Sequence, residues 1–125
     1  MLKSLVAATV CILLMDASWL TFNYTYHKKL FESVQNSPIA VRLIPAALVY
    51  VLIPLALYYF AIQPRKSEKD SIIKGSLLGL SMYGLYDLTN LATLKGWTTE
   101  MAIRDTLWGT VACGTASFVG FYFNN

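Results

Sequence analysis

Three aspartates, Asp16, Asp87 and Asp105, lie inside long apolar stretches of the sequence. A carboxylate near the centre of a bilayer costs about 2.5 to 3.5 kcal/mol on the insertion scale, so such residues are rare and usually functional. Carboxyl groups of unequal proton affinity are suited to proton transfer, cation binding and acid–base catalysis. The aspartates therefore indicate a polar site within a membrane, and by themselves they do not select one of these activities.

The stretch around Asp87 carries polar and aromatic side chains on one face. Tyr83, Asp87, Asn90 and Leu94 stand at positions i, i+4, i+7 and i+11, which is the spacing of a single helix face. The Asn90 carboxamide can also form a structural hydrogen bond between helices, which would stabilise the bundle by about 0.6 to 2 kcal/mol. We expect this face to form one wall of the site.

Each of the other two aspartates precedes a tryptophan by three residues, which gives an Asp-x-x-Trp pair on two different stretches. An indole N–H can donate a hydrogen bond to a carboxylate on a neighbouring helix, and the ring shields the site from lipid. The candidate ligand-binding pocket comprises Asp16, Trp19, Tyr83, Asp87, Asn90, Asp105 and Trp108.

Cations that would balance three carboxylates are few. Arg104 is the one basic residue nearby, and Glu100 stands one helical turn before it as an alternative partner. Either an aspartate is protonated at neutral pH or the pocket holds a positively charged ligand. No metal or cofactor is predicted, because the single histidine, His27, excludes a bis-histidine haem site and a His-rich metal centre. An all-oxygen divalent-cation site built from the aspartates and Asn90 is the weaker alternative.

The composition places the chain in the membrane class. Of its 125 residues 56% are hydrophobic and 14% are charged, which is too apolar for an ordinary soluble domain. The net charge of +3 comes from ten Lys and Arg that stand mostly between apolar runs, as in the loops of membrane proteins. The expected partner is the lipid bilayer, and nucleic acid is not expected as a partner.

Four apolar runs predict an all-α integral membrane fold, with four transmembrane helices in one compact bundle and a single domain over residues 1–125. The expected spans are residues 4–24, 39–62, 71–94 and 99–123. Asn36 and Pro38 are expected to start the second span, and Pro45 and Pro54 to kink it. That span is otherwise apolar all round, so most of it is expected to face lipid or to pack passively.

Shorter elements connect these spans. A short interfacial helix is expected at residues 26–36, because Leu30, Phe31 and Val34 alternate with charged residues at helical spacing. The hydrophilic segment 63–70 forms a loop, with Asp70 or Ser71 as the cap of the third span. Residues 98–100, Thr-Thr-Glu, supply a hydroxyl cap and a first-turn acid for the fourth span.

The three aspartates are expected at similar depth. With a rise of about 1.5 Å per residue, Asp16 lies about 12 Å before the end of the first span and Asp87 about 10 Å before the end of the third. Asp105 lies about 9 Å after the start of the fourth span. All three distances are measured from the same membrane face, because the first and third spans leave the membrane on the side where the fourth enters. The carboxylates can therefore meet in one half of the bilayer.

Glycines mark faces for close helix packing. Gly75 and Gly79 stand four residues apart on the third span, and Gly109 and Gly120 lie on a stripe of small residues on the fourth. Such faces fit a second helix of the same chain, and they also fit a homo-oligomer or another partner helix.

Four spans put both termini on the same side of the membrane, and the basic residues divide evenly between the sides. The terminal side would carry Lys3, Arg65, Lys66, Lys69 and Lys74, and the opposite side Lys28, Lys29, Arg42, Lys95 and Arg104. We place the termini in the cytoplasm, because the densest basic cluster lies between the second and third spans and Lys3 precedes a run that resembles a signal anchor.

Three motifs together resemble a known family. Residues 15–20, 86–97 and 105–109 read Met-Asp-Ala-Ser-Trp-Leu, Tyr-Asp-Leu-Thr-Asn-Leu-Ala-Thr-Leu-Lys-Gly-Trp and Asp-Thr-Leu-Trp-Gly. Over nearly its whole length the chain resembles the mostly bacterial family of small membrane proteins known as domain of unknown function 2177. The resemblance implies a four-helix integral membrane protein and no known activity, ligand or cofactor. It favours a bacterial inner membrane, while the longer polar segment after the first span and the Lys- and Asn-rich loops leave a eukaryotic or viral membrane open.

Three functions fit these residues. The leading hypothesis is a membrane protein that binds or transports a small solute, cation or proton through an acidic pocket. The second is an intramembrane enzyme that modifies a lipid or isoprenoid with two aspartates as acid and base. The third is a structural or accessory subunit in which the aspartates only hold the bundle together. An enzyme is the less favoured class.

Overall fold

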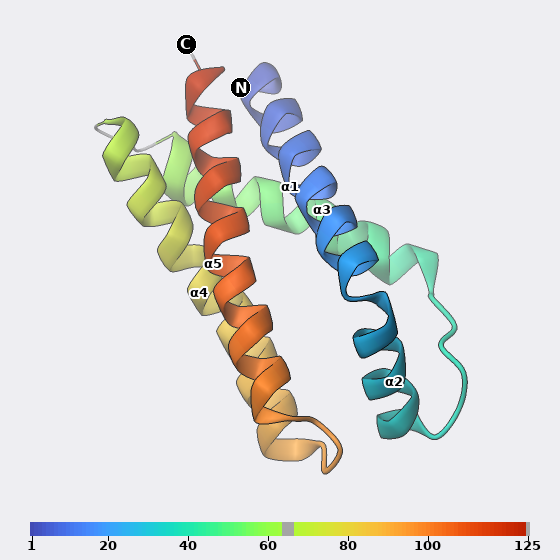
Figure 1. Ribbon diagram of the computed structural model, residues 1–125. Coiled ribbons are helices and arrows are strands. Elements are labelled where there is room, and N and C mark those ends of the chain that lie inside the picture. The colour runs from blue at the N-terminus through green and yellow to red at the C-terminus, as the bar shows by residue number, and fades with distance from the viewer. Residues whose placement is uncertain (64–66, 125) are drawn as a thin grey trace.

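The computed structural model describes residues 1–63 and 67–124, and all secondary-structure elements in this part of the chain are helices (Figure 1). Its elements are α1 (Leu2–Phe22), α2 (Tyr24–Gln35), α3 (Leu43–Leu57), the π-helical turn η1 (Tyr58–Ile62), α4 (Glu68–Thr93) and α5 (Thr99–Tyr122). Both termini lie at the same end of the molecule (Figure 1), as the prediction of an even number of spans requires.

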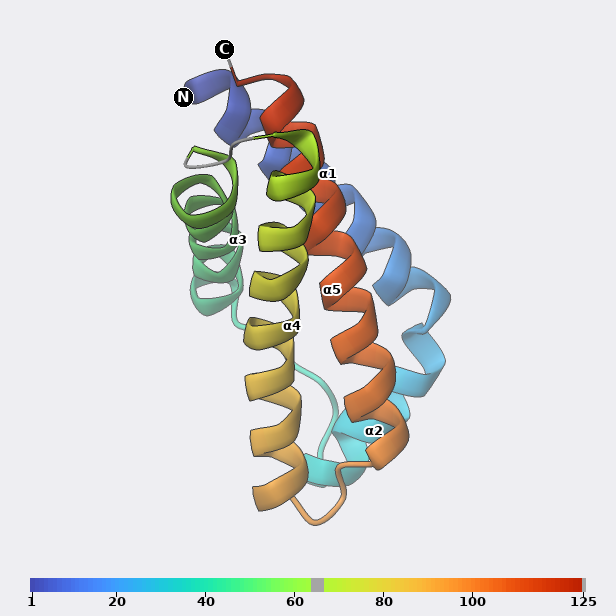
Figure 2. The same ribbon diagram turned by 90° about the vertical axis from the view of Figure 1, so that its left-hand side faces the viewer.

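Three long helices run alongside one another, and α3 crosses them (Figures 1 and 2). The most extensive packing joins α4 to α5, and α1 packs chiefly against α5. Pro54 lies inside α3, where it cannot donate a backbone hydrogen bond, and the helix continues into the wider turn η1. The crossing brings α3 into contact with α1, α4 and α5.

Two helices in the described part of the chain are long and apolar enough to cross a membrane, Leu2–Phe22 and Leu43–Ile62. Only 17% and 22% of their most apolar windows are buried inside the protein. The core helix of a soluble protein would be mostly buried, so these exposed apolar surfaces are suited to lipid. The helical fold is therefore confirmed, whereas the bundle of four spans remains a prediction.

The chain between α2 and α3 differs from the prediction. Asn36 was expected to cap the start of the second span, but it ends α2 in the left-handed conformation, with φ of 58°, and its N–H bonds to the Glu32 carbonyl at 2.8 Å. Asparagine tolerates this conformation better than most residues, which suits it to a helix C-terminus. Residues 37–42 are not helical, and α3 begins at Leu43, so the predicted start at residue 39 is wrong.

The starts of α4 and α5 follow the rules of helix capping. Thr98 accepts a hydrogen bond from the Met101 N–H at 3.1 Å, which confirms the predicted hydroxyl cap of α5. At α4 the cap is Ser67, which accepts from the Asp70 N–H at 3.1 Å, so the cap predicted at Asp70 or Ser71 is wrong by about one turn. The predicted loop at 63–70 includes residues 64–66, which lie outside the described residues.

The glycine faces are filled within the chain. A methyl group added at Gly75 would collide with Ser117, one at Gly79 with the backbone of Gly109, and one at Gly109 with the ring of Tyr83. Gly120 lies in the same way against Ile62 and Ala8. These glycines therefore pack helices of the same chain, with α4, α5, α1 and η1 against them, and a homo-oligomer or partner helix at these faces is not shown.

Buried hydroxyl groups tie the helices together at the end that carries the termini. Ser71 of α4 and Ser117 of α5 are fully buried, and their hydroxyl oxygens lie 2.8 Å apart. Ser4 of α1 donates to the Gly120 carbonyl of α5 at 2.8 Å. These bonds fix α1 and α4 on opposite sides of α5.

At the other end, α2 folds back on the turn between α4 and α5. Its buried Leu30 packs with Trp97 and Met101, and Phe31 and Val34 border this small core. The apolar face predicted for residues 26–36 is thus present, and α2 closes the lower end of the helices (Figure 1).

Candidate functional site

Asp16 lies at the centre of a hydrogen-bonded group drawn from four helices. Its Oδ2 atom accepts from the Tyr50 hydroxyl at 2.8 Å and from the Tyr83 hydroxyl at 3.4 Å. Its Oδ1 atom accepts from the Trp108 indole Nε1 at 3.1 Å. The residue is 8% exposed. Three donors around one buried carboxylate supply the polar contacts that the charge would otherwise find in water.

The predicted indole donor is confirmed for one of the two Asp-x-x-Trp pairs. Trp108 donates to Asp16, and Trp19 stacks on Trp108 with ring centroids 4.8 Å apart and planes 9° apart. The Trp19 Nε1 atom has no hydrogen-bond partner among the described residues. Trp19 therefore supports the ring of Trp108, and it does not bind a carboxylate.

A cavity of about 530 Å³ opens beside this group. Asp16 and Asp105 supply its carboxylates, and Phe31, Tyr50, Tyr83 and Tyr86 supply its rings. The wall is completed by His27, Leu20, Val49, Leu52, Ile53, Met82 and Met101. All five α-helices contribute to the wall, and none of its described residues is a lysine or an arginine.

His27 forms the side of the cavity next to α2. It is 6% exposed, and its Nδ1 atom has no hydrogen-bond partner among the described residues. Burial lowers the pKa of His27; the negative charge of Asp105 opposes this shift, and Arg104 adds to it. A neutral imidazole thus lies at the polar edge of the cavity.

Arg104 does not pair with an aspartate in the described structure. Its guanidinium lies 3.6 Å from the Glu100 carboxylate, as the alternative pairing predicted, and it donates to the Asn23 side chain. It also lies over the Tyr26 ring, 4.9 Å from the centroid. The positive charge closest in sequence to Asp105 is therefore engaged at the junction of α1 and α2.

Asp87 lies behind the cavity wall. Its side chain is fully buried, and it lies beside Asp105, the Trp97 indole and Thr106. Neither of its oxygens has a donor at hydrogen-bond geometry among the described residues. Asn90, which lies beside Tyr86, is likewise not part of the wall.

The three aspartates occupy two adjoining positions. Asp16 and Asp105 face the cavity, and Asp87 contacts Asp105 from behind. Among the described residues no three acidic, histidine or cysteine side chains lie close enough together to hold a metal ion. The alternative of a divalent-cation site built from all three aspartates therefore has no ligand cluster to support it.

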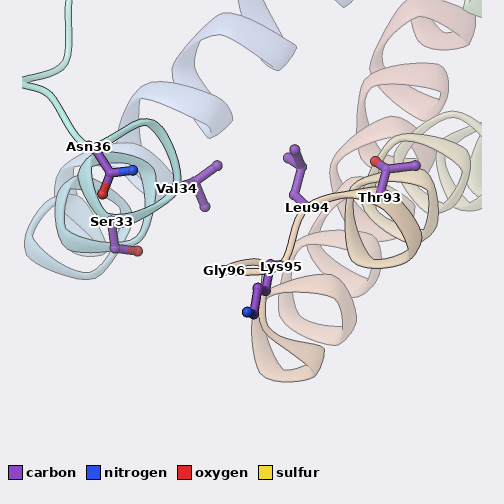
Figure 3. A pocket seen from close by; sticks show the side chains of 7 residues that line it. All are labelled: Ser33, Val34, Asn36, Thr93, Leu94, Lys95 and Gly96. Carbon is purple, nitrogen blue, oxygen red and sulfur yellow. The ribbon is translucent and has the colours of Figure 1, made fainter.

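A second cavity, of about 390 Å³, lies between the end of α2 and the turn after α4 (Figure 3). Its lining residues are Ser33, Val34, Asn36, Thr93, Leu94, Lys95 and Gly96. It contains no aspartate, and Ser33 and Thr93 already donate to backbone carbonyls. The chemistry predicted from the sequence thus belongs to the first cavity.

Comparison with known protein families gives one match, which covers residues 1–122 and carries the description predicted membrane protein (DUF2177). The chain belongs to the DUF2177 family. In comparisons with curated proteins and with solved structures nothing matched. The family resemblance seen in the three motifs is therefore confirmed, and the family description adds membrane residence without an activity.

Two residues of this DUF2177 protein belong to the site although the sequence did not indicate them. Tyr50 makes the shortest hydrogen bond to Asp16. In the sequence its polar hydroxyl group was the one feature that set it apart in a predicted span that was otherwise expected to face lipid or to pack passively. His27 was used only to exclude a haem or His-rich metal site, but it lies on α2 and lines the cavity. Both are placed by how α2 and α3 pack against the other helices.

Proposed function

We propose that this DUF2177 protein crosses the membrane four times and binds a small organic cation in the cavity between its helices. The observation that carries the binding proposal is the wall itself, whose described residues include two carboxylates and four aromatic rings and no lysine or arginine. Aromatic faces and carboxylates together are the groups that recognise substituted ammonium ions. A largely apolar wall with a few converging polar groups is typical of small-molecule sites.

The outer surfaces of α4 and α5 support four spans. Apolar side chains more than half exposed point outward from both helices, namely Leu77, Leu85, Leu88, Ile103, Leu107 and Val111. Three polar side chains of the same two helices, those of Ser71, Asp87 and Ser117, are fully buried inside. Helices that are apolar outside and polar inside are suited to a lipid environment.

The proposed orientation places both termini in the cytoplasm, most simply of a bacterial inner membrane. A reporter that is active only in the cytoplasm is then expected to be active when it is fused at the C-terminus and inactive when it is fused after Lys95. Opposite activities of the two fusions would reverse the orientation, and equal activities would contradict four spans.

Cation binding fits the two cavity carboxylates better than catalysis does. Asp16 already accepts three hydrogen bonds, which leaves it suited to hold negative charge in place. Asp105 has the freer carboxylate, because it is only partly buried and faces the same space. An acid–base pair would need a second carboxyl group free to exchange a proton with the ligand, whereas Asp16 is held by three donors and Asp87 lies behind the wall.

The binding test uses purified protein in lipid nanodiscs and benzyltrimethylammonium as the probe. We expect saturable binding by isothermal titration calorimetry, and weaker binding of benzyl alcohol, which has a similar ring and no charge. Asp105→Asn is expected to raise Kd about tenfold, because it removes one of two opposing charges.

Asp70→Asn is the matched control, since Asp70 lies at the start of α4 and pairs with Lys74 at 3.0 Å, away from the cavity. It is expected to leave Kd within about twofold of the wild-type value. Equal binding of the charged and neutral probes, or an unchanged Kd in Asp105→Asn, would contradict the proposed function.

A further inference from the structure

The buried Asp87 carboxyl has surroundings that an ionised carboxylate does not tolerate. It is 0% exposed, and no donor at hydrogen-bond geometry serves either oxygen among the described residues. No lysine or arginine forms an ion pair with it in the described structure. An unpaired carboxylate without solvent would cost several kcal/mol, and a neutral carboxylic acid avoids most of that cost.

A second carboxyl group, that of Asp105, lies beside it, together with the Trp97 indole and Thr106. Two carboxylates side by side repel each other and have no hydrogen to share. With one proton between them, the same two groups form a strong hydrogen bond from acid to carboxylate. The contact is therefore favourable only when one of the two residues is protonated.

Burial decides which residue holds the proton. Asp87 is sealed from the cavity, whereas Asp105 is partly buried and lines it. We propose that Asp87 is a protonated positioning residue, whose carboxylic acid donates a hydrogen bond to the Asp105 carboxylate and holds it toward the cation site. This inference rests on the cation-binding function proposed above.

The groups around the pair agree with this assignment. The titratable and charged side chains that face Asp87, Asp105 or the cavity between them are Asp16 of α1, His27 of α2, Tyr50 of α3, Tyr83 and Tyr86 of α4, and Arg104 of α5. Of these only Arg104 is permanently positive, and its guanidinium is held by Glu100 and Asn23. The proton is therefore the available positive charge between the two carboxyl groups.

A protonated Asp87 has two effects on Asp105. It offsets part of the negative charge that the buried site would otherwise carry, and its O–H group fixes the direction of the neighbouring Asp105 carboxylate. An asparagine at position 87 keeps a donor of the same shape, whereas leucine keeps the branched skeleton, is larger and removes the donor. This difference separates a positioning role from a purely structural one.

The first measurement does not depend on any ligand. Infrared spectroscopy of the protein in nanodiscs at neutral pH is expected to show the carbonyl stretch of a protonated carboxylic acid, which is lost in Asp87→Asn and retained in Asp70→Asn. Absence of this band in the wild-type protein, or its persistence in Asp87→Asn, would overturn the assignment of the proton.

The second measurement uses benzyltrimethylammonium. Asp87→Asn is expected to bind within about twofold of wild type and Asp87→Leu about tenfold more weakly. If wild type binds and Asp87→Leu binds equally well, the positioning role is wrong and the proposed function stands. If wild type does not bind the probe, the proposed function fails, and the infrared band still reports on the proton.

Discussion

Replacement of Asp16 by asparagine is expected to destabilise the protein by about 2 to 3 kcal/mol. The carboxylate accepts hydrogen bonds from Tyr50, Tyr83 and Trp108. A hydrogen bond to a charged group contributes about 1.5 to 3 kcal/mol and a neutral one about 0.5 to 1.5, so each bond weakens by about 1 kcal/mol when the charge is removed. The asparagine NH₂ group also replaces one acceptor oxygen, which leaves at least one of the three donors badly served.

The same chemical change at Asp87 is expected to cost less than about 1 kcal/mol. No described donor bonds to Asp87, so the amide removes no acceptor that the fold uses. The two variants therefore form an internal comparison of the same substitution: Asp16→Asn removes a charge that accepts three hydrogen bonds, whereas Asp87→Asn removes neither a bonded acceptor nor, under the proposal above, a charge.

Equilibrium unfolding in detergent micelles, followed by tryptophan fluorescence, measures both variants against wild type. Asp70→Asn is the control for removal of an acid that is partly exposed, and it is expected to cost less than about 1 kcal/mol. The reasoning fails if Asp16→Asn unfolds with the free energy of wild type, or if Asp87→Asn loses as much stability as Asp16→Asn.

Two further changes test the packing and the histidine. Gly109→Ala would drive a methyl group into the Tyr83 ring and is expected to lower the free energy of unfolding, measured by thermal unfolding, by about 1 to 3 kcal/mol. In the control Gly84→Ala the methyl group would meet Thr106 at 3.6 Å, and the expected loss is less than about 1 kcal/mol. Equal losses in the two variants would contradict the packing of α4 on α5. The pKa of His27 is lowered by burial, so the unfolded chain binds more protons than the folded one, and the stability contributed by neutral His27 is complete above pH 6.5 and declines as the pH falls below it. The stability of wild type relative to His27→Gln is therefore expected to decrease between about pH 7.5 and about pH 5.5, and a constant difference would show that His27 is not held neutral.

Local rules predicted the parts of the site that depend on one helix. The Asp-x-x-Trp spacing places Trp108 and Asp105 on the same helix, and the donation of Trp108 to Asp16 follows once α1 and α5 pack together. The Thr98 cap follows from its side-chain oxygen and from the residues after it. In both cases the relevant information lies within a few residues.

The path of α3 was not predictable in this way. Residues 43–62 are apolar on all sides, so their periodicity does not say which face meets the protein. The crossing of α3 over the other helices decides that Tyr50 reaches Asp16 at 2.8 Å. A uniformly apolar run predicts that a helix forms. It does not predict the rotation of that helix about its axis, which tertiary packing determines.

Glycine spacing had a similar limit. The Gly75 and Gly79 spacing correctly indicates a surface for close contact, yet the same spacing fits a helix of another chain. What decides the partner is the matching surface on α5, where Gly109 and Ser117 leave room for the α4 backbone. The small residues of two stretches are therefore informative as a pair, and neither stretch identifies its partner alone.

The depth of the aspartates and their contact are separate properties, and only the first follows from counting residues. Depth depends on the rise along each helix, which places Asp16, Asp87 and Asp105 at one level. Contact depends on helix rotation, and the rotation of α4 turns Asp87 away from the cavity toward Asp105. Asp87 is separated from the cavity and from solvent, and the neighbouring carboxyl group of Asp105 is among its polar contacts. Asp87 was predicted to line the pocket, and by this geometry it is better suited to positioning Asp105, which does line it.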